Sequence, residues 1–240
     1  MSGFEWRCVL CGSRFAEHAP CCGSCLDNGT IVRVGRRAHA AIDGAAEVTT
    51  AAALAKAAWT PVVSAAYTHL RLGSGALLVL YGAPGSGKSS MATRLIGGLR
   101  APVILQSVEE TPGPSLHARL ERCGVRRDDF LVAGRASVDQ IAALVQKTRA
   151  AALAIDSVQV AAFSAEDLRH LLLVLPTLRV VVAIAQVNKH GEIEGRQRLL
   201  HESDIAIHVE GLRWRVTKSR YQGGEVMGDV LAEEMNNATA

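Results

Sequence analysis

The segment Gly-Ala-Pro-Gly-Ser-Gly-Lys-Ser at residues 82–89 constrains the fold more than any other part of the sequence. It matches the pattern GxxxxGK[ST] in full, an apolar run (76–81) precedes it, and a helical pattern follows it. Glycines let backbone N–H groups curl around a β-phosphate, and the following helix presents its positive end to that phosphate. The pattern therefore predicts a strand, a phosphate-binding loop and a helix in succession.

This loop predicts ATP and Mg²⁺ as ligands. Lys88 would neutralise charge on the β- and γ-phosphates, and Ser89 would coordinate Mg²⁺. A glycine-rich turn that matches by chance is the alternative, and the flanking strand and helix argue against it. The predicted nucleotide-binding residues are Gly82, Ala83, Pro84, Gly85, Ser86, Gly87, Lys88, Ser89 and Ser90.

Short apolar runs alternate with helical patterns through the rest of the chain. Each apolar run has the length of a strand buried on both faces, and together they cover 76–81, 102–107, 129–134, 151–156 and 179–186. Helices are predicted after Lys88, over about 115–123, from Ser137 and from near Ser164. After residue 203 three short runs predict antiparallel strands at one sheet edge. The expected fold is α/β with a mostly parallel central sheet.

Polar side chains stand at the ends of three of these strands. Asp156 ends one strand, where a carboxylate can reach Mg²⁺ through water; a turn or cap residue is the alternative. Glu109 and Glu110 follow another strand, and a carboxylate there can polarise the attacking water, although a solvated loop would look the same. Gln186 ends a third strand and could sense a γ-phosphate, or serve only as a polar strand end.

The N-terminal segment carries two Cys-x-x-Cys pairs, and each pair can present two thiolates to one tetrahedral Zn²⁺. Cys21 and His18 are possible substitute ligands, and a dithiol redox switch is the alternative to zinc. The isolated Cys123 is predicted to be a small buried residue. The predicted zinc ligands are Cys8, Cys11, Cys22 and Cys25.

Three zones are expected: a zinc module at 1–35, an alanine-rich linker or helix at 36–60, and an ATPase domain at 61–240. The formal charge of +3 is too small to indicate nucleic-acid binding by itself. No apolar run is long enough to span a membrane, and the N-terminus lacks a signal-peptide pattern. A cytoplasmic location is therefore expected, where clustered thiols more often bind metal than form disulfides.

Taken in order, these motifs resemble the RadA/Sms family of bacterial RecA-like recombination ATPases. The cysteine pairs and the P-loop match, and further matches are 107–111 (SVEET), 154–159 (AIDSVQ), 188–204 and 218–222 (KSRYQ). The resemblance implies a RecA-like P-loop core with an N-terminal zinc ribbon or knuckle. It also makes Glu109 the counterpart of the catalytic glutamate.

The resemblance further implies that Lys218 and Arg220 act on the γ-phosphate of a neighbouring subunit, in a homo-oligomeric ring that is plausibly hexameric. Two solvated residues on an edge strand are the alternative. If single-stranded DNA binds, the expected surface is the 188–198 loop, through Lys189, Arg196 and Arg198.

The sequence also departs from the family. Val108 replaces a glycine, Gln222 replaces the last glycine of the KNRFG signature, and no counterpart of the Lon-protease-like domain follows. The leading expectation is a RadA-like, DNA-stimulated ATPase of recombination and DNA repair. The alternative is a regulatory ATPase switch with a protein partner and little DNA-dependent activity.

Overall fold

The chain divides into two compact units, Met1–Ala58 and Trp59–Ala240. The computed structural model describes residues 5–8, 14–15, 31–34, 51, 61–110, 112–187 and 197–231. In the first unit, β1 (Glu5–Cys8) pairs antiparallel with β2 (Arg14–Phe15) and with β3 (Ile31–Val34). The side chains of the four predicted zinc ligands lie outside the described part of the chain, so the zinc site stays a prediction.

The second unit is built on an eight-stranded sheet with the order β13-β12-β11-β6-β10-β9-β7-β8. Every neighbouring pair from β11 to β8 is parallel, which confirms the predicted α/β architecture with a mostly parallel sheet. These strands are β6 (Ala76–Gly82), β7 (Val103–Ser107), β8 (Phe130–Ala133), β9 (Ala152–Asp156), β10 (Val180–Gln186) and β11 (Ile205–Glu210).

The antiparallel edge begins one strand later than the sequence suggested. β11 joins β6 in parallel, and only β12 (Arg213–Ser219) and β13 (Met227–Asp229) run antiparallel to their neighbours. α7 (Gln197–Glu202) returns the chain to the starting edge of β6, where the backbone N–H of Asp204 bonds the carbonyl of Leu77 at 2.8 Å. That return makes the β11 pairing parallel.

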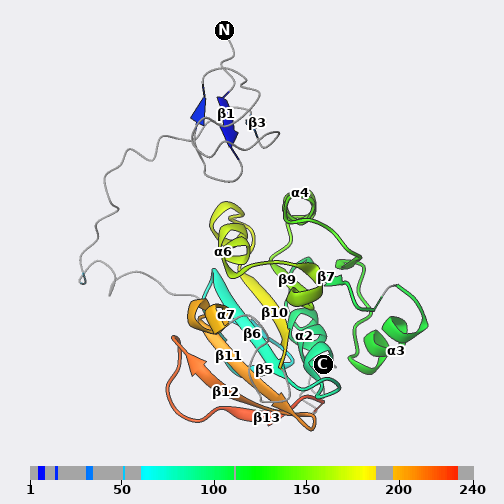
Figure 1. The fold of residues 1–240 in the computed structure, drawn as a ribbon. Helices are drawn as coiled ribbons and strands as arrows, with labels where there is room; N and C mark the ends of the chain where they lie inside the picture. Colours follow the sequence, from blue (N-terminus) through cyan, green and yellow to red (C-terminus); the bar gives the residue numbers. More distant parts are fainter. Residues whose placement is uncertain are drawn as a thin grey trace. The chain divides into compact units, whose positions relative to one another are not determined.

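Two layers cover the sheet, as Figure 1 shows. One apolar cluster joins the sheet to α2 (Lys88–Gly97), to α3 (Pro114–Arg122) and to a hairpin of β4 (Val62–Ser64) and β5 (Tyr67–Leu72). A second cluster joins the other face to α4 (Val138–Thr148), α5 (Val158–Ala161), α6 (Ala165–Val174) and α7. The sheet interior is therefore dry on both faces, as its aliphatic strands require.

The predicted helix starts at Ser137 and Ser164 are confirmed. Each serine side chain accepts from the backbone N–H three residues later, and the side chain of that residue bonds back, which forms a capping box. The sequence analysis did not identify the β4–β5 hairpin. No helix among the described residues has the length and apolar character needed to cross a bilayer.

Candidate nucleotide-binding site

The polar strand ends gather at one edge of the sheet, because the carboxyl ends of parallel strands lie together. Gly82 on β6 is in register with Gln186 on β10, and Ser107 on β7 is in register with Asp156 on β9. Glu109 is two residues beyond Ser107, and its backbone N–H bonds the carbonyl of Asp156 at 3.4 Å. The P-loop and the three polar strand ends predicted from the sequence therefore share one edge.

Lys88 lies at the centre of this edge, at the first residue of α2. Its ammonium donates to the carbonyl oxygens of Gly82 (3.0 Å) and Ala83 (2.7 Å), so it closes the loop on itself. Burial lowers the pKa of Lys88, and the charges of Asp156 and Glu109 oppose that shift. A buried lysine with only loop carbonyls as acceptors gains a stronger partner when a phosphate enters.

The P-loop has little room for side chains. A Cβ on Gly82 would lie 2.1 Å from the carbonyl oxygen of Val209, and the residue has a φ of 152°. Gly87, at a φ of 108°, precedes α2 and faces Leu212 in the turn between β11 and β12. The backbone N–H of Leu212 also bonds the carbonyl of Ser86 at 3.1 Å. The late strands thus hold the loop from outside.

The loop has the features that a phosphate and Mg²⁺ require. The backbone N–H groups of the first turn of α2 have no partner within the helix, and no side chain caps them. The buried hydroxyl of Ser86 lacks a hydrogen-bond partner among the described residues. Hard oxygen donors for Mg²⁺ are available on Ser89 and Asp156, in keeping with the ligands this ion prefers. The residues present therefore fit a magnesium–nucleotide complex.

Asp156 is buried and paired with an arginine that the sequence analysis missed. Arg119 on α3 places Nη1 2.8 Å from Asp156 Oδ2 and Nη2 3.1 Å from Glu110 Oε2. The contact to Asp156 has hydrogen-bond geometry, whereas the one to Glu110 is a close ion pair without it. A pattern signal existed, because Leu116, Arg119 and Cys123 follow helical spacing on the apolar side of α3.

Glu109 is tied to two neighbouring strand ends. The hydroxyl of Ser157 donates to Glu109 Oε1, and the amide of Gln186 donates to both carboxylate oxygens, at 3.0 and 3.1 Å. Gln159 in turn donates to the backbone carbonyl of Gln186 at 3.1 Å. This set of bonds fixes a carboxylate next to the phosphate loop and links it to Gln186, two residues before the 188–196 segment.

Lys218 and Arg220 lie near the other end of the sheet. The backbone N–H of Arg220 bonds the carbonyl of Asp204, which is level with the start of β6, whereas the P-loop follows its end. The five residue steps of β6 from Leu77, beside Asp204, to Gly82 at the P-loop correspond to roughly 16 Å at about 3.3 Å per residue. Arg220 cannot reach a phosphate held by the P-loop of its own chain.

Both cations already have partners within the chain. Lys218 donates to the carbonyls of Leu200 (2.7 Å) and His201 (2.8 Å) at the end of α7. Arg220 lies 3.3 Å from Asp204 Oδ1, and Arg169 holds the second oxygen of Asp204 at 2.8 Å. Any action on a neighbour's phosphate requires these contacts to be exchanged.

The three expected DNA contacts are only partly described. Lys189 and Arg196 lie outside the described residues. Arg198 on α7 is exposed, but it pairs with Glu166 and with Glu202, the latter at 2.7 Å. These two carboxylates compete with any phosphate for the guanidinium.

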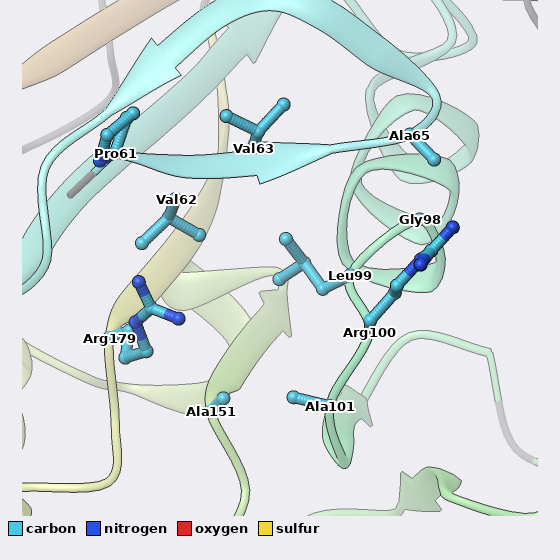
Figure 2. A pocket seen from close by; sticks show the side chains of 10 residues that line it. All are labelled: Pro61, Val62, Val63, Ala65, Gly98, Leu99, Arg100, Ala101, Ala151 and Arg179. Atoms are coloured by element: carbon cyan, nitrogen blue, oxygen red, sulfur yellow. The ribbon is translucent and has the colours of Figure 1, made fainter.

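A separate hollow of about 400 Å³ lies at the amino ends of the parallel strands, opposite the P-loop. Figure 2 shows Val62 and Leu99 beside it, with Arg100 and Arg179 among its lining residues. Leu99, Ala151 and Arg179 all precede strands, so the hollow faces the amino ends of β7, β9 and β10. Ligands of open α/β sheets bind at the carboxyl ends, so the candidate site remains at the P-loop.

Comparison with known proteins confirms the resemblance to RadA. The chain is 27% identical over 199 residues to the DNA repair protein RadA of Aquifex aeolicus (strain VF5). That match covers 69% of this chain and 43% of the relative, so the chain spans less than half of the relative's length.

Other comparisons add less. Among solved structures, the flagellar accessory protein FlaH from Methanocaldococcus jannaschii matches at a TM-score of 0.48 and 11% identity. That match covers 64% of this chain and 84% of FlaH. No family model matches the sequence.

Proposed function

We propose that this protein is a RadA-like, RecA-like ATPase that binds single-stranded DNA in recombination or DNA repair and acts as a ring oligomer. The observation that carries the proposal is that the P-loop after β6, which holds Lys88, lies on the same side of the sheet as Asp156 at the end of β9 and Glu109 after β7. A P-loop with a metal carboxylate and a second carboxylate for water is the set that phosphoryl transfer to water needs.

In this proposal Lys88 binds the β- and γ-phosphates and Ser89 and Asp156 hold Mg²⁺. Magnesium would neutralise charge that develops on the transferred phosphoryl group. Glu109 would accept a proton from the attacking water, and Gln186 would report the γ-phosphate. The hydrogen bonds of Gln186 to Glu109 support this pairing of roles, since a change at the carboxylate reaches the residue that precedes the 188–196 loop.

The proposed DNA binding and ring assembly are supported by the RadA relative and by the position of Arg220. The RadA relative is a DNA repair protein by name, which supports DNA as the ligand. The distance between Arg220 and the P-loop of its own chain supports an action between subunits, because a phosphate could then be reached only in a neighbour. In the proposed ring, the late strands of each subunit would lie against the nucleotide site of the next subunit.

The test is ATP turnover by the full chain with and without single-stranded DNA, at two salt concentrations. A DNA-dependent ATPase should gain about tenfold or more in rate, and the gain should weaken at high salt because phosphate contacts release counterions. Lys88→Ala serves as the control for contaminating activity. Turnover that DNA does not change would refute the DNA-stimulated ATPase.

One observation favours a second candidate function, a regulatory ATPase switch with a protein partner. Arg198 is neutralised by Glu166 and Glu202, which lowers the positive charge available to DNA on the described part of the expected surface. For this switch, nucleotide binding would persist while turnover stayed low and unaffected by DNA.

Metal analysis of the same preparation would test the proposed zinc at Cys8, Cys11, Cys22 and Cys25, for which one Zn²⁺ per chain is expected.

A further inference from the structure

Arg119 is as deeply buried as the P-loop lysine. Its residue is 5% exposed, as is Asp156, so the ion pair between them is almost fully removed from water. Removing a guanidinium and a carboxylate from water is costly, and such a pair persists only where its geometry is good. The 2.8 Å contact between Nη1 and Oδ2 meets that requirement.

Two nitrogens of the guanidinium make no hydrogen bond to the described residues. Its Nε and Nη2 lack hydrogen-bond acceptors among the described residues, although Nη2 lies 3.1 Å from a carboxylate oxygen of Glu110. A purely structural arginine in a folded core normally satisfies its donors. Arg119 instead makes its one hydrogen bond to Asp156 and lies beside a second carboxylate, Glu110, which indicates that its task is at these two carboxylates.

Arg119 contacts carboxylates that follow or end two different strands. Asp156 ends β9, and Glu110 follows β7 directly after Glu109. The backbone N–H of Val108 bonds the carbonyl of Asp156 at 2.9 Å, so the two strand ends are also joined through the main chain. A rigid fork that touches both carboxylates fixes the side chain of one relative to the other.

We propose that Arg119 is a positioning residue for the magnesium carboxylate, which acts by fixing the orientation of Asp156 through Oδ2. This inference rests on the proposed nucleotide site. With Oδ2 held by the guanidinium, Oδ1 is left to accept from a water on Mg²⁺. Arg119 itself touches neither the metal nor the phosphates in this role. It corresponds to the outer partners that orient metal ligands in other proteins, whose loss costs about 10- to 100-fold in metal affinity.

The experiment compares Arg119→Met, Arg119→Lys and Arg122→Met with the unmodified protein. Arg122 lies three residues along the same helix on an exposed position and so controls for the loss of a positive charge from α3. A fluorescent ADP derivative is titrated first in EDTA and then at fixed nucleotide with increasing Mg²⁺. Thermal melting in the absence of nucleotide reports the folding of each variant.

Arg119→Met should raise the apparent dissociation constant for Mg²⁺ by about 10- to 100-fold. Its nucleotide affinity in EDTA should stay within about twofold of the unmodified protein, because the P-loop is intact. Arg119→Lys keeps the charge and one contact, so it should recover part of the Mg²⁺ affinity and also guards against a methionine variant that does not fold. Arg122→Met should match the unmodified protein in both titrations.

An unchanged Mg²⁺ dependence in both folded Arg119 variants would overturn the positioning role while leaving the nucleotide site intact. A tighter Mg²⁺ affinity would overturn it as well, because the guanidinium would then be competing with the metal. Equal losses of nucleotide affinity with and without Mg²⁺ would show that Arg119 only supports the fold. An unmodified protein that binds no nucleotide would instead refute the proposed function itself.

Discussion

The side-chain amide of Gln186 donates to both carboxylate oxygens of Glu109, at 3.0 and 3.1 Å. The sequence pattern predicts separate roles for these residues at separate strand ends, and the fold brings the two side chains together. Two hydrogen bonds from one amide hold the carboxylate in one orientation. A γ-phosphate that attracts the amide would release the carboxylate toward water.

Replacing Gln186 with glutamate should therefore separate binding from turnover. The new carboxylate would face Glu109 and repel it, so kcat should fall by about two orders of magnitude while affinity for an ATP analogue changes little. Gln186→Ala should lose less, because it removes the bond without adding charge. Steady-state turnover and equilibrium binding measure the two effects, and Gln146→Glu on exposed α4 is the control. Equal kcat values in all variants would contradict this role.

Lys88 gives a pH-dependent prediction. Burial lowers its pKa in the empty site, and a bound phosphate should raise it again by supplying an opposite charge. At alkaline pH below the ordinary pKa of lysine, part of the empty protein should hold a neutral amine, so nucleotide binding should take up protons. Calorimetry in two buffers of different ionisation enthalpy measures that uptake, and Lys88→Met should abolish both uptake and tight binding. Binding without proton uptake across the alkaline range would contradict the assignment.

The lowered pKa of Lys88 also predicts how the free energy of unfolding depends on pH. Between the lowered pKa of folded Lys88 and its ordinary value, the unfolded chain carries the proton and the folded chain does not. The free energy of unfolding of the empty protein should therefore gain a positive contribution as pH rises through that window. Nucleotide, which restores the proton, should reduce this gain. Chemical denaturation at several alkaline pH values, with Lys88→Met for comparison, measures it.

Gly82 should tolerate no side chain. A Cβ there would lie 2.1 Å from the Val209 carbonyl, and the φ of 152° is one that residues with side chains rarely adopt. Gly82→Ala should therefore displace the loop from β11, lower stability by about 3 kcal/mol or more, and abolish nucleotide binding. Gly134→Ala, where a Cβ has no heavy atom within 4 Å, is the matched control and should be near neutral. Denaturant unfolding and binding assays check both.

Tyr67 packs against the late strands that hold the P-loop from outside. Its buried hydroxyl donates to the carbonyl of Val230 at 2.8 Å, beside the edge-on ring of Trp214, and burial raises its pKa above the ordinary value. Tyr67→Phe should lower the free energy of unfolding by about 1–2 kcal/mol, because the carbonyl loses its partner. The control is Tyr81→Phe, since Tyr81 makes an exposed bond to Thr217 and should lose less than about 0.5 kcal/mol.

The sequence predicted the elements that local pattern determines. Aliphatic runs located five of the six strands that pair in parallel to within two residues, and the serine caps located two helices, because each of these signals is carried by residues close together in the sequence. It could not predict the partner of β11, which depends on where α7 returns the chain. The pairing of Arg119 with Asp156 joins residues that are 37 apart, and helical spacing alone indicates only that the arginine is buried.

The arrangement of Arg220 allows a test of action between subunits. Arg220 cannot reach its own P-loop, so Arg220→Ala should bind ATP normally and lose about a thousandfold in turnover. Glu109→Ala should also be inactive but should retain its arginine.

In a mixed ring, an intact Arg220 from one variant would meet an intact Glu109 from the other, and turnover should return to a fraction of the unmodified rate. Because Arg220 also contacts Asp204, melting curves must show that Arg220→Ala is folded. Arg213→Ala on β12, the strand that Arg220 follows, controls for lost charge. Recovery should be absent when either variant carries both substitutions. Folded partners that assemble without any recovery would show that Arg220 acts only through Asp204 within its own chain.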